Sequence, residues 1–208
     1  MIRQAIFSTL MAVAAADVAG ASQISIGGCA GPTAGYGATT CVAGATTVDF
    51  NTATVPSNFS GTGAVFSGTT RTWATPAGDT SPYLAVSTTA AGVEDLKLPG
   101  IGNYLGLLWG SIDDYNYIEL YLNHVKVDTI DGASVRAVGT PRGNQFLPGS
   151  NEYVNIMRAG GFDEVKLITT QYNFEVDNIA YAQVPEPGAV GLLAMGMLGV
   201  FAVRRRHR

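Results

Sequence analysis

Short runs of alternating apolar and polar residues follow one another along most of the chain, separated by clusters of Gly, Pro, Asn, Asp and Thr. The clusters recur about every 8–15 residues, and no helical period stands out between the two ends. This pattern is typical of an antiparallel β-sandwich. The expected strands are residues 23–26, 46–50, 83–87, 93–98, 104–109, 117–122, 125–130, 134–138, 152–157, 164–169 and 173–181.

The alternation is clearest where Ile118 and Leu120 share one face of a strand and Tyr117 and Tyr121 share the other. The Asn-His pair that follows, residues 123–124, predicts a two-residue hairpin turn, because Asn tolerates a positive φ.

The last run has a similar pattern with one irregularity. Phe174 and Val176 fall on one face, and Glu175 and Asp177 on the other. Ile179 breaks this phase, which predicts a β-bulge just after Asp177.

Other parts of the chain carry weaker patterns. Residues 51–81 are rich in Gly, Thr and Ser and predict at most short strands at 64–66 and 71–74. Residues 139–150 predict a long loop.

The N-terminus has the composition of an export signal. Arg3 precedes an apolar run at residues 5–16, and Ala19-Gly20-Ala21 fits a small-residue cleavage pattern. We therefore expect a signal peptide at residues 1–21 that passes the chain to the Sec translocon. The alternative is a buried or membrane helix, but the apolar run is shorter than the roughly 20 residues that a membrane-spanning helix needs.

The C-terminus combines three features in a fixed order. Pro185-Glu186-Pro187 enforces extended backbone, and an apolar stretch follows at residues 189–203. A basic tail completes the chain and would stay in the cytoplasm, so the segment predicts a short transmembrane helix and a membrane-anchored intermediate. The arginines of that tail are Arg204, Arg205, Arg206 and Arg208.

This order of motif, apolar helix and arginine cluster closely resembles the PEP-CTERM sorting signal of Gram-negative bacteria. The resemblance implies recognition by an exosortase, a membrane-embedded, transpeptidase-like enzyme. The exosortase would cut near the motif and pass the protein to the cell surface or the exopolysaccharide layer. The resemblance covers about 25 residues and says nothing of the activity of the exported domain.

A second resemblance lies in the body of the chain. Residues 104–116, with the sequence YLGLLWGSIDDYN, look like a segment of one group of PEP-CTERM surface proteins. Residues 161–163 and 174–179 are similar to the closing strands of that group's jelly-roll-like domain, and the likeness spans about 46–181. Proteins of this group are exported and have no settled biochemical role.

These readings give an all-β fold, a jelly-roll-like antiparallel β-sandwich flanked by an N-terminal signal helix and a C-terminal transmembrane helix. The expected divisions are a signal peptide at 1–21, a Gly-rich stapled segment at 22–45, the sandwich at 46–183 and the sorting signal at 184–208. Residues 22–184 carry seven basic and 14 acidic residues, a net charge of −7, which argues against a nucleic-acid partner.

The two cysteines, Cys29 and Cys41, lie 12 positions apart in a Gly-rich stretch. In an oxidising compartment such a pair predicts a disulfide, worth about 3 kcal/mol by loop closure. A metal pair is the alternative, but no nearby His completes a site.

Two sets of carboxylates are candidates for Ca²⁺, which takes six to eight oxygen ligands. Asp113 and Asp114 lie in an expected turn, where they could equally cap the backbone. Asp49 and Asp177 look like the positions in the first and last strands that hold a structural Ca²⁺ in jelly-roll carbohydrate-binding modules. Their alternative is two solvated strand residues or a turn cap.

A sugar-binding hypothesis rests on aromatic residues that could form a stacking platform, namely Tyr115, Tyr117 and Tyr121 with Trp109 and Trp73. Tyr117 and Tyr121 share a strand face and could stack on the flat faces of sugars. Alternatively they are ordinary aromatics of a sandwich core or rim, and Trp109, within an apolar run, is expected in the core.

No catalytic constellation stands out. The mature domain has one histidine, His124, and it is expected in an exposed turn, so a serine nucleophile would lack its base. The carboxylates of the domain show no glycosidase pattern. We therefore expect a non-enzymatic surface protein with a structural or adhesive role in exopolysaccharide or biofilm. The alternative is a lectin-type carbohydrate-binding module with a structural Ca²⁺.

Overall fold

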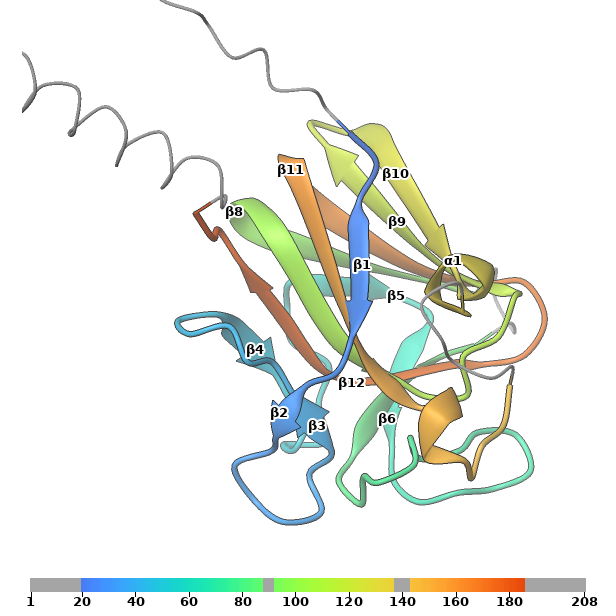
Figure 1. Ribbon diagram of the computed structural model, residues 1–208. Coiled ribbons are helices and arrows are strands. Elements are labelled where there is room, and N and C mark those ends of the chain that lie inside the picture. Colours follow the sequence, from blue (N-terminus) through green and yellow to red (C-terminus); the bar gives the residue numbers. More distant parts are fainter. Residues whose placement is uncertain (1–19, 88–91, 137–142, 186–208) are drawn as a thin grey trace, which may run out of the picture.

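The computed structural model describes residues 20–87, 92–136 and 143–185, and these residues are predominantly β-structure (Figure 1). The strands are β1 (Gln23–Ile26), β2 (Cys29–Ala30), β3 (Ala38–Thr39), β4 (Thr46–Val48), β5 (Phe59–Gly61), β6 (Gly63–Phe66), β7 (Tyr83–Val86), β8 (Val93–Trp109), β9 (Asn116–Leu122), β10 (Val125–Asp131), β11 (Glu152–Thr169) and β12 (Phe174–Ala182). A short helix, α1 (Gly132–Arg136), and a 3-10 turn, Pro148–Ser150, accompany them. The predicted all-β class is confirmed.

One antiparallel sheet of ten strands forms both layers of the sandwich. Its order is β10-β9-β11-β8-β12-β7-β6, while β1 pairs with β11, β4 with β12 and β5 with β8. Strands β2 and β3 form a separate two-stranded ribbon.

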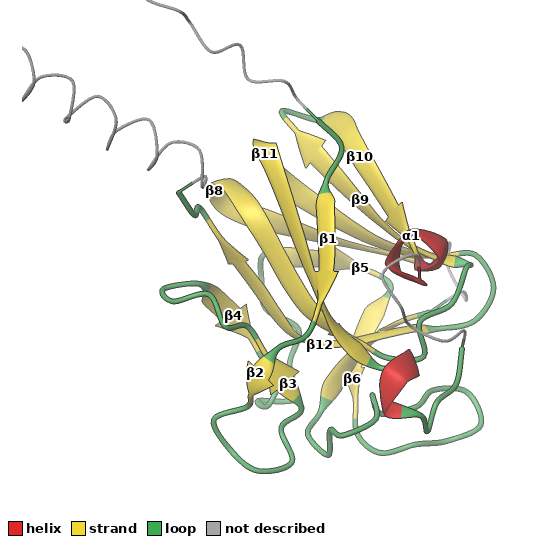
Figure 2. Ribbon diagram, in the orientation of Figure 1, coloured by secondary structure: helices red, strands yellow, loops and turns green. Residues whose placement is uncertain are grey.

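The two longest strands connect the layers. The first part of β8, up to Lys97, pairs with β5 and with the second part of β11, and its last part, from Tyr104, pairs with β12 and the first part of β11. Figure 2 shows both as long, curved strands. The register of β11 shifts between Met157 and Phe162, and Gly161 has a φ of 71° there, a conformation that favours glycine.

This arrangement corrects the prediction of separate strands at 93–98 and 104–109 and at 152–157 and 164–169. Pro99 and Gly100 have the composition of a turn, but the strand runs on through them, because β8 pairs with β11 before them at Lys97 and after them at Gly102.

Apolar side chains from both layers meet in one buried cluster. Trp109 is fully buried as expected, and its ring lies 4.7 Å from that of Phe174, centroid to centroid. Each fully buried aliphatic or aromatic side chain contributes roughly 1.5–3 kcal/mol through removal from water. Other members are Phe50, Phe59, Leu84, Leu96, Leu105, Leu107, Ile118, Leu120, Val154, Ile156, Phe162, Val165, Leu167 and Val176.

Two local predictions about turns are confirmed. Asn123 and His124 join β9 to β10 with φ values of 51° and 66°. The register of β12 against β8 shifts between Asp177 and Ala180, and Asn178 has a φ of 48°, which is the expected bulge.

The predicted strand at 134–138 is wrong over its described part. Residues up to Arg136 form α1, and the carboxylate of Asp131 accepts hydrogen bonds from the amide and hydroxyl of Ser134, both at 2.7 Å. This local capping favours a helical turn over an extended run.

The weak strand expected at 71–74 is also absent, because Thr70 bonds the amides of Thr72 and Trp73 in a turn. The short strand expected at 64–66 is present as part of β6. Strands β2, β3 and β5 had no counterpart among the expected runs.

The described residues contain no helix of the length and apolarity needed to cross a membrane. The expected signal peptide lies outside them except for its last two residues, and the apolar stretch at 189–203 lies wholly outside them.

Candidate functional site

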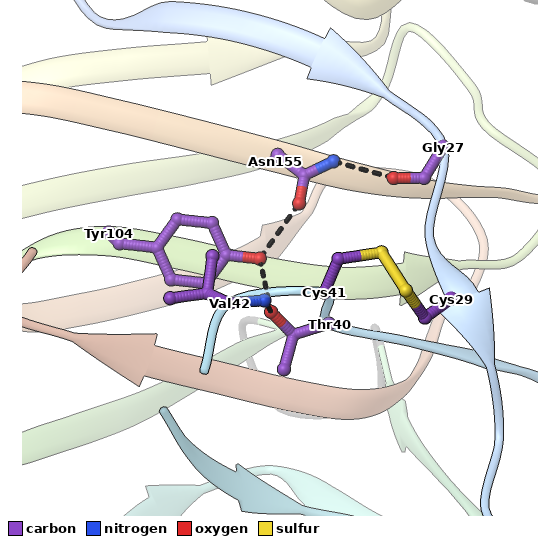
Figure 3. Close-up of a disulfide and its surroundings, with 7 residues drawn as sticks. All are labelled: Gly27, Cys29, Thr40, Cys41, Val42, Tyr104 and Asn155. Atoms are coloured by element: carbon purple, nitrogen blue, oxygen red, sulfur yellow. Dashed lines mark hydrogen bonds between the residues drawn. A yellow bond between two sulfur atoms is a disulfide. The ribbon is translucent and has the colours of Figure 1, made fainter. Parts of the chain in front are cut away.

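A disulfide between Cys29 and Cys41 closes the loop that carries β2 and β3, with their Cα atoms 5.2 Å apart (Figure 3). The predicted disulfide is thus present.

A chain of hydrogen bonds attaches this loop to the sheet. The amide of Val42 donates to Thr40 Oγ1, whose hydroxyl lies 2.7 Å from that of Tyr104 on β8 (Figure 3). The hydroxyl of Tyr104 donates to Asn155 Oδ1 at 2.7 Å, so Thr40 is the donor toward Tyr104. Asn155 Nδ2 donates in turn to the carbonyl of Gly27 at 2.8 Å. The stapled segment is therefore bonded to β8 and β11 through their side chains.

The same loop covers the outward face of β12. Asn178 Nδ2 donates to the carbonyls of Tyr36 and Ala38, at 2.7 and 3.0 Å. Gly37 has a φ of 63°, and a Cβ there would lie 2.6 Å from Leu108 and 3.3 Å from Asp79. The loop can approach so closely because this position lacks a side chain.

Beneath this cover lies a pair of buried carboxyls. Asp79 and Asp177 are 7% and 0% exposed, and a hydrogen bond joins their side chains. Ser81 Oγ lies between them, 2.5 Å from Asp79 Oδ1 and 3.2 Å from Asp177 Oδ2. Burial and the neighbouring Asp79 raise the pKa of Asp177 to about 9, so this carboxyl is protonated at neutral pH.

Asp49 has a different environment from Asp177. It is exposed, and its Oδ1 accepts a hydrogen bond from the amide of Asn51 in its own turn at 3.2 Å. The two carboxyls therefore differ in burial and in their contacts, and the Ca²⁺ site proposed for them stays a prediction. No cluster of three or more His, Cys, Asp or Glu side chains suited to a metal occurs in the part of the chain that the structure describes.

The Asp113-Asp114 turn makes bonds of the kind expected of caps and ion pairs. Asp113 accepts from the hydroxyl of Tyr115, and Asp114 pairs with Arg136 at the end of α1. Asp113 also lines a pocket, and that pocket is the strongest candidate site on the sandwich.

The pocket has a volume of about 290 Å³ and opens between the 71–72 segment, the 111–115 turn and the beginning of β12. Its lining is largely polar and includes Arg71, Ser111, Asp113, Tyr115, Tyr172 and Glu175. The rings of Tyr115 and Tyr172 meet edge to face with centroids 5.6 Å apart, and Tyr172 is 69% exposed. A ligand at this edge would meet both an open aromatic face and several hydrogen-bonding groups.

Two buried polar groups lie in the wall of the pocket. Glu175 is 5% exposed, its Oε1 accepts from the amide of Ala74 at 3.2 Å, and burial with a smaller effect from Asp113 raises its pKa to about 8. Ser111 is 7% exposed, has a φ of 49°, and its Oγ has no hydrogen-bond partner among the described residues. Left-handed backbone and unpaired buried hydroxyls concentrate at binding sites.

Tyr117 and Tyr121, the tyrosines chosen from sequence, lie on the outward face of β9 as expected. The hydroxyl of Tyr121 donates to Glu119 at 2.6 Å, and Lys166 Nζ lies 5.0 Å from the centre of its ring. These contacts engage the ring and the hydroxyl of Tyr121. The aromatic pair that borders a pocket is instead Tyr115 and Tyr172, and only Tyr115 stood among the sequence candidates.

The sorting signal begins where β12 ends. Asn103 on β8 is 1% exposed and bonds both backbone groups of Val184, donating from Nδ2 to the carbonyl and accepting at Oδ1 from the amide, each at 2.7 Å. Pro185 follows directly. Glu186, Pro187 and the tail arginines lie outside the described residues.

Comparison with known proteins identifies the C-terminal segment. Residues 183–206 match the PEP-CTERM protein-sorting motif, so the chain carries the signal of proteins sorted to the surface by an exosortase. No curated protein matches the chain.

One similar solved structure is the enzymatically active domain of bacteriophage CBA120 tailspike protein 4. It is 13% identical with a TM-score of 0.30, and the match covers 65% of this chain and 20% of that one. The chain thus spans about a fifth of that protein's length, and so low a score supports no conclusion about fold or function.

Proposed function

We propose that the chain is a non-catalytic structural or adhesive protein of the cell surface or exopolysaccharide matrix, with a jelly-roll-like β-sandwich as the exported body. The sorting motif implies export, a membrane-anchored intermediate and surface delivery through an exosortase. In this proposal the Sec translocon exports the chain, the host is Gram-negative, and the sandwich associates with exopolysaccharide in a biofilm.

The observation that carries the proposal is the direct junction between the folded body and the sorting motif. Strand β12 ends at Ala182, and the matched motif begins at residue 183. The disulfide between Cys29 and Cys41 supports the same destination, because such bonds persist in oxidising compartments outside the cytosol.

The environment of His124 supports the non-catalytic part of the proposal. Its side chain is 88% exposed on the hairpin turn, and its Nδ1 lies 4.0 Å from the carboxylate of Glu164. So exposed an imidazole lacks the enclosed, oriented setting in which a histidine activates a serine nucleophile.

Fractionation of the host tests surface sorting. The wild-type protein is expected in the surface or extracellular fraction, and a chain with Pro185, Glu186 and Pro187 all replaced by Ala is expected to accumulate in the inner membrane. As a control, a chain with Thr52→Ala, Ala53→Ser and Thr54→Ala changes three exposed residues and leaves the motif intact. Equal surface delivery of wild-type and motif variant would contradict the proposal.

A second candidate function, carbohydrate binding, is favoured by the pocket. A neutral sugar presents a flat C–H face for Tyr172 and hydroxyls for Asp113, Ser111 and Glu175, and such pockets place a few polar groups around an apolar contact. Glu175, neutral below pH of about 8, would act as a donor as well as an acceptor.

Glycan-array binding separates the two candidates. Sugar binding at the pocket predicts at least tenfold weaker binding for Tyr172→Ala, while Tyr121→Ala on the other part of the sheet keeps wild-type affinity. Loss on Tyr121→Ala alone would favour the platform of Tyr117 and Tyr121, and no binding by the wild type would leave the structural role.

A further inference from the structure

The end of the folded body is fixed by the side chain of a single residue. Tyr181 and Ala182 pair with Leu105 and Tyr104 in the β12–β8 ladder. Two residues farther on, Val184 has both backbone groups bonded to the side chain of Asn103, with 2.7 Å for each bond.

The amide of Asn103 acts here as a substitute for a strand. Its Nδ2 faces a carbonyl and its Oδ1 faces an N–H, so the orientation of the amide is set by the bonds themselves. Asn103 is 1% exposed and lies just beyond the bend of β8, where β8 no longer offers its backbone to the tail. The side chain thereby extends the ladder by one more pair.

This contact determines which backbone an approaching enzyme can bind. Enzymes that recognise extended chains do so largely through backbone N–H and C=O groups. Both groups of Val184 are occupied, and every residue from 174 to 182 lies within β12. Cleavage before Val184 would therefore need local unfolding of the body.

We propose that Asn103 is a positioning residue for sorting: it withholds Val184 and the chain before it, so that the exosortase breaks a peptide bond on the C-terminal side of Val184. The inference rests on the proposed function. In the reaction one amide C–N bond breaks, the released amine of the C-terminal fragment takes up a proton, and the acyl carbon passes to water or to a hydroxyl or amine acceptor.

The geometry leaves the enzyme a short segment. Four residues, 185–188, separate Val184 from Ala189, where the apolar stretch begins, and a fully extended chain spans at most about 18 Å over the five steps between those two residues. Because Asn103 holds Val184 on the body, residues 185–188 are all of the chain that separates the held residue from the apolar stretch.

The C-terminal mass of the protein processed in its host tests the cut position. The wild type should end at Val184 or later. Asn103→Leu, which keeps the volume but loses both bonds, should add ends before Val184, and Asn103→Ala is the second variant if this one fails to fold. Asn116→Leu, at another fully buried Asn whose Nδ2 donates to Asn173, is the matched control and should keep the wild-type ends.

Products of the wild type that lack Val184, or identical ends in all variants, would overturn the inference. A wild-type chain that is never cut would contradict the proposed function and, with it, the cut position.

Hydrogen exchange of the Val184 amide in the purified full chain tests the contact without the exosortase. Exchange should be at least tenfold slower in wild type and Asn116→Leu than in Asn103→Leu. An unprotected Val184 amide in the wild type would show that Asn103 does not hold the tail.

Discussion

At the scale of single residues, the outward face of β12 carries two acids that are both buried. Glu175 and Asp177 are 5% and 0% exposed, and burial is the main cause of the raised pKa of each. Ala74, Ser81 and Asp79 supply their contacts, so segments about 100 positions away cover them. A native state that holds acids in neutral form is sensitive to pH well above the usual range of carboxyls.

The first prediction concerns this sensitivity. Between pH of about 4 and about 8 the unfolded chain releases the protons of Glu175 and Asp177 while the native state keeps them, so stability should fall as pH rises. The slope is at most about 1.4 kcal/mol per pH unit for each group. The melting temperature should therefore be higher at pH 5.5 than at pH 8.5.

Asp177→Asn isolates one contribution, because the amide stays neutral and still donates to Asp79. The variant should have a flatter pH profile than wild type, and Asp49→Asn at the exposed turn serves as control. A wild-type melting temperature that rises between pH 5.5 and 8.5, or an unchanged slope in Asp177→Asn, would contradict the account.

The second prediction concerns the hydroxyl of Tyr104, which joins Thr40 to Asn155. Tyr104→Phe should lower the free energy of unfolding by about 1–3 kcal/mol, since Thr40 and Asn155 each lose a partly buried hydrogen bond. Urea denaturation measures this, with Tyr121→Phe, whose hydroxyl bonds Glu119, as a control of smaller effect. Equal losses in the two variants would argue against a stabilising role of the Tyr104 bonds.

At the scale of elements, the stapled loop combines a covalent closure with hydrogen bonds to three strands. Residues of the stapled segment, 22–45, bond Tyr104 on β8, Asn155 on β11 and Asn178 on β12. The disulfide keeps the unfolded loop short, and the native loop covers polar groups of the sheet that would otherwise face water. Opening the disulfide should therefore loosen the loop that covers the outward face of β12.

The third prediction follows. Replacing Cys29 and Cys41 by Ser should cost about 3 kcal/mol, by loop-closure entropy. For a domain of this size the melting temperature should fall by about 6–12 °C. Reductant should lower the wild-type melting temperature by a similar amount and leave the Ser variant unaffected; a wild type indifferent to reductant would refute the role of the disulfide.

The elements also separate what local sequence predicts from what it does not. Strands β9 and β10 and their hairpin were predictable, because alternation and the Asn-His turn act within a few residues. The continuity of β8 through Pro99 was not, because it depends on pairing with β11, more than 50 positions away. Helix α1 was not predicted, because the hydrogen bonds that Asp131 makes to its first turn outweigh the weak strand propensity of these residues.

The same division holds for the site. Asp113 and Tyr115 were visible as a polar turn with an aromatic neighbour. Glu175 was expected on the outward face of its strand, but its burial depends on the distant Ala74 segment. Tyr172 follows the last residues of β11, and nothing in its local sequence marks it as the partner of Tyr115.

At the scale of the whole molecule, the chain consists of a disulfide-closed β-body and a sorting signal joined without an intervening linker. Asn103 belongs to the body, and Val184 is among the first residues of the signal. Their two hydrogen bonds therefore hold the beginning of the sorting signal on the folded body. The residues from 22 to 184 carry a net charge of −7, which keeps the body well solvated outside the cell.

The intact mass of the protein recovered from the surface fraction of its host tests the central claim most directly. The account predicts a chain that has lost the residues up to about Ala21 and the arginines from Arg204 onward, with Cys29 and Cys41 oxidised. A full-length chain recovered from the cytosol, with both thiols free, would contradict it.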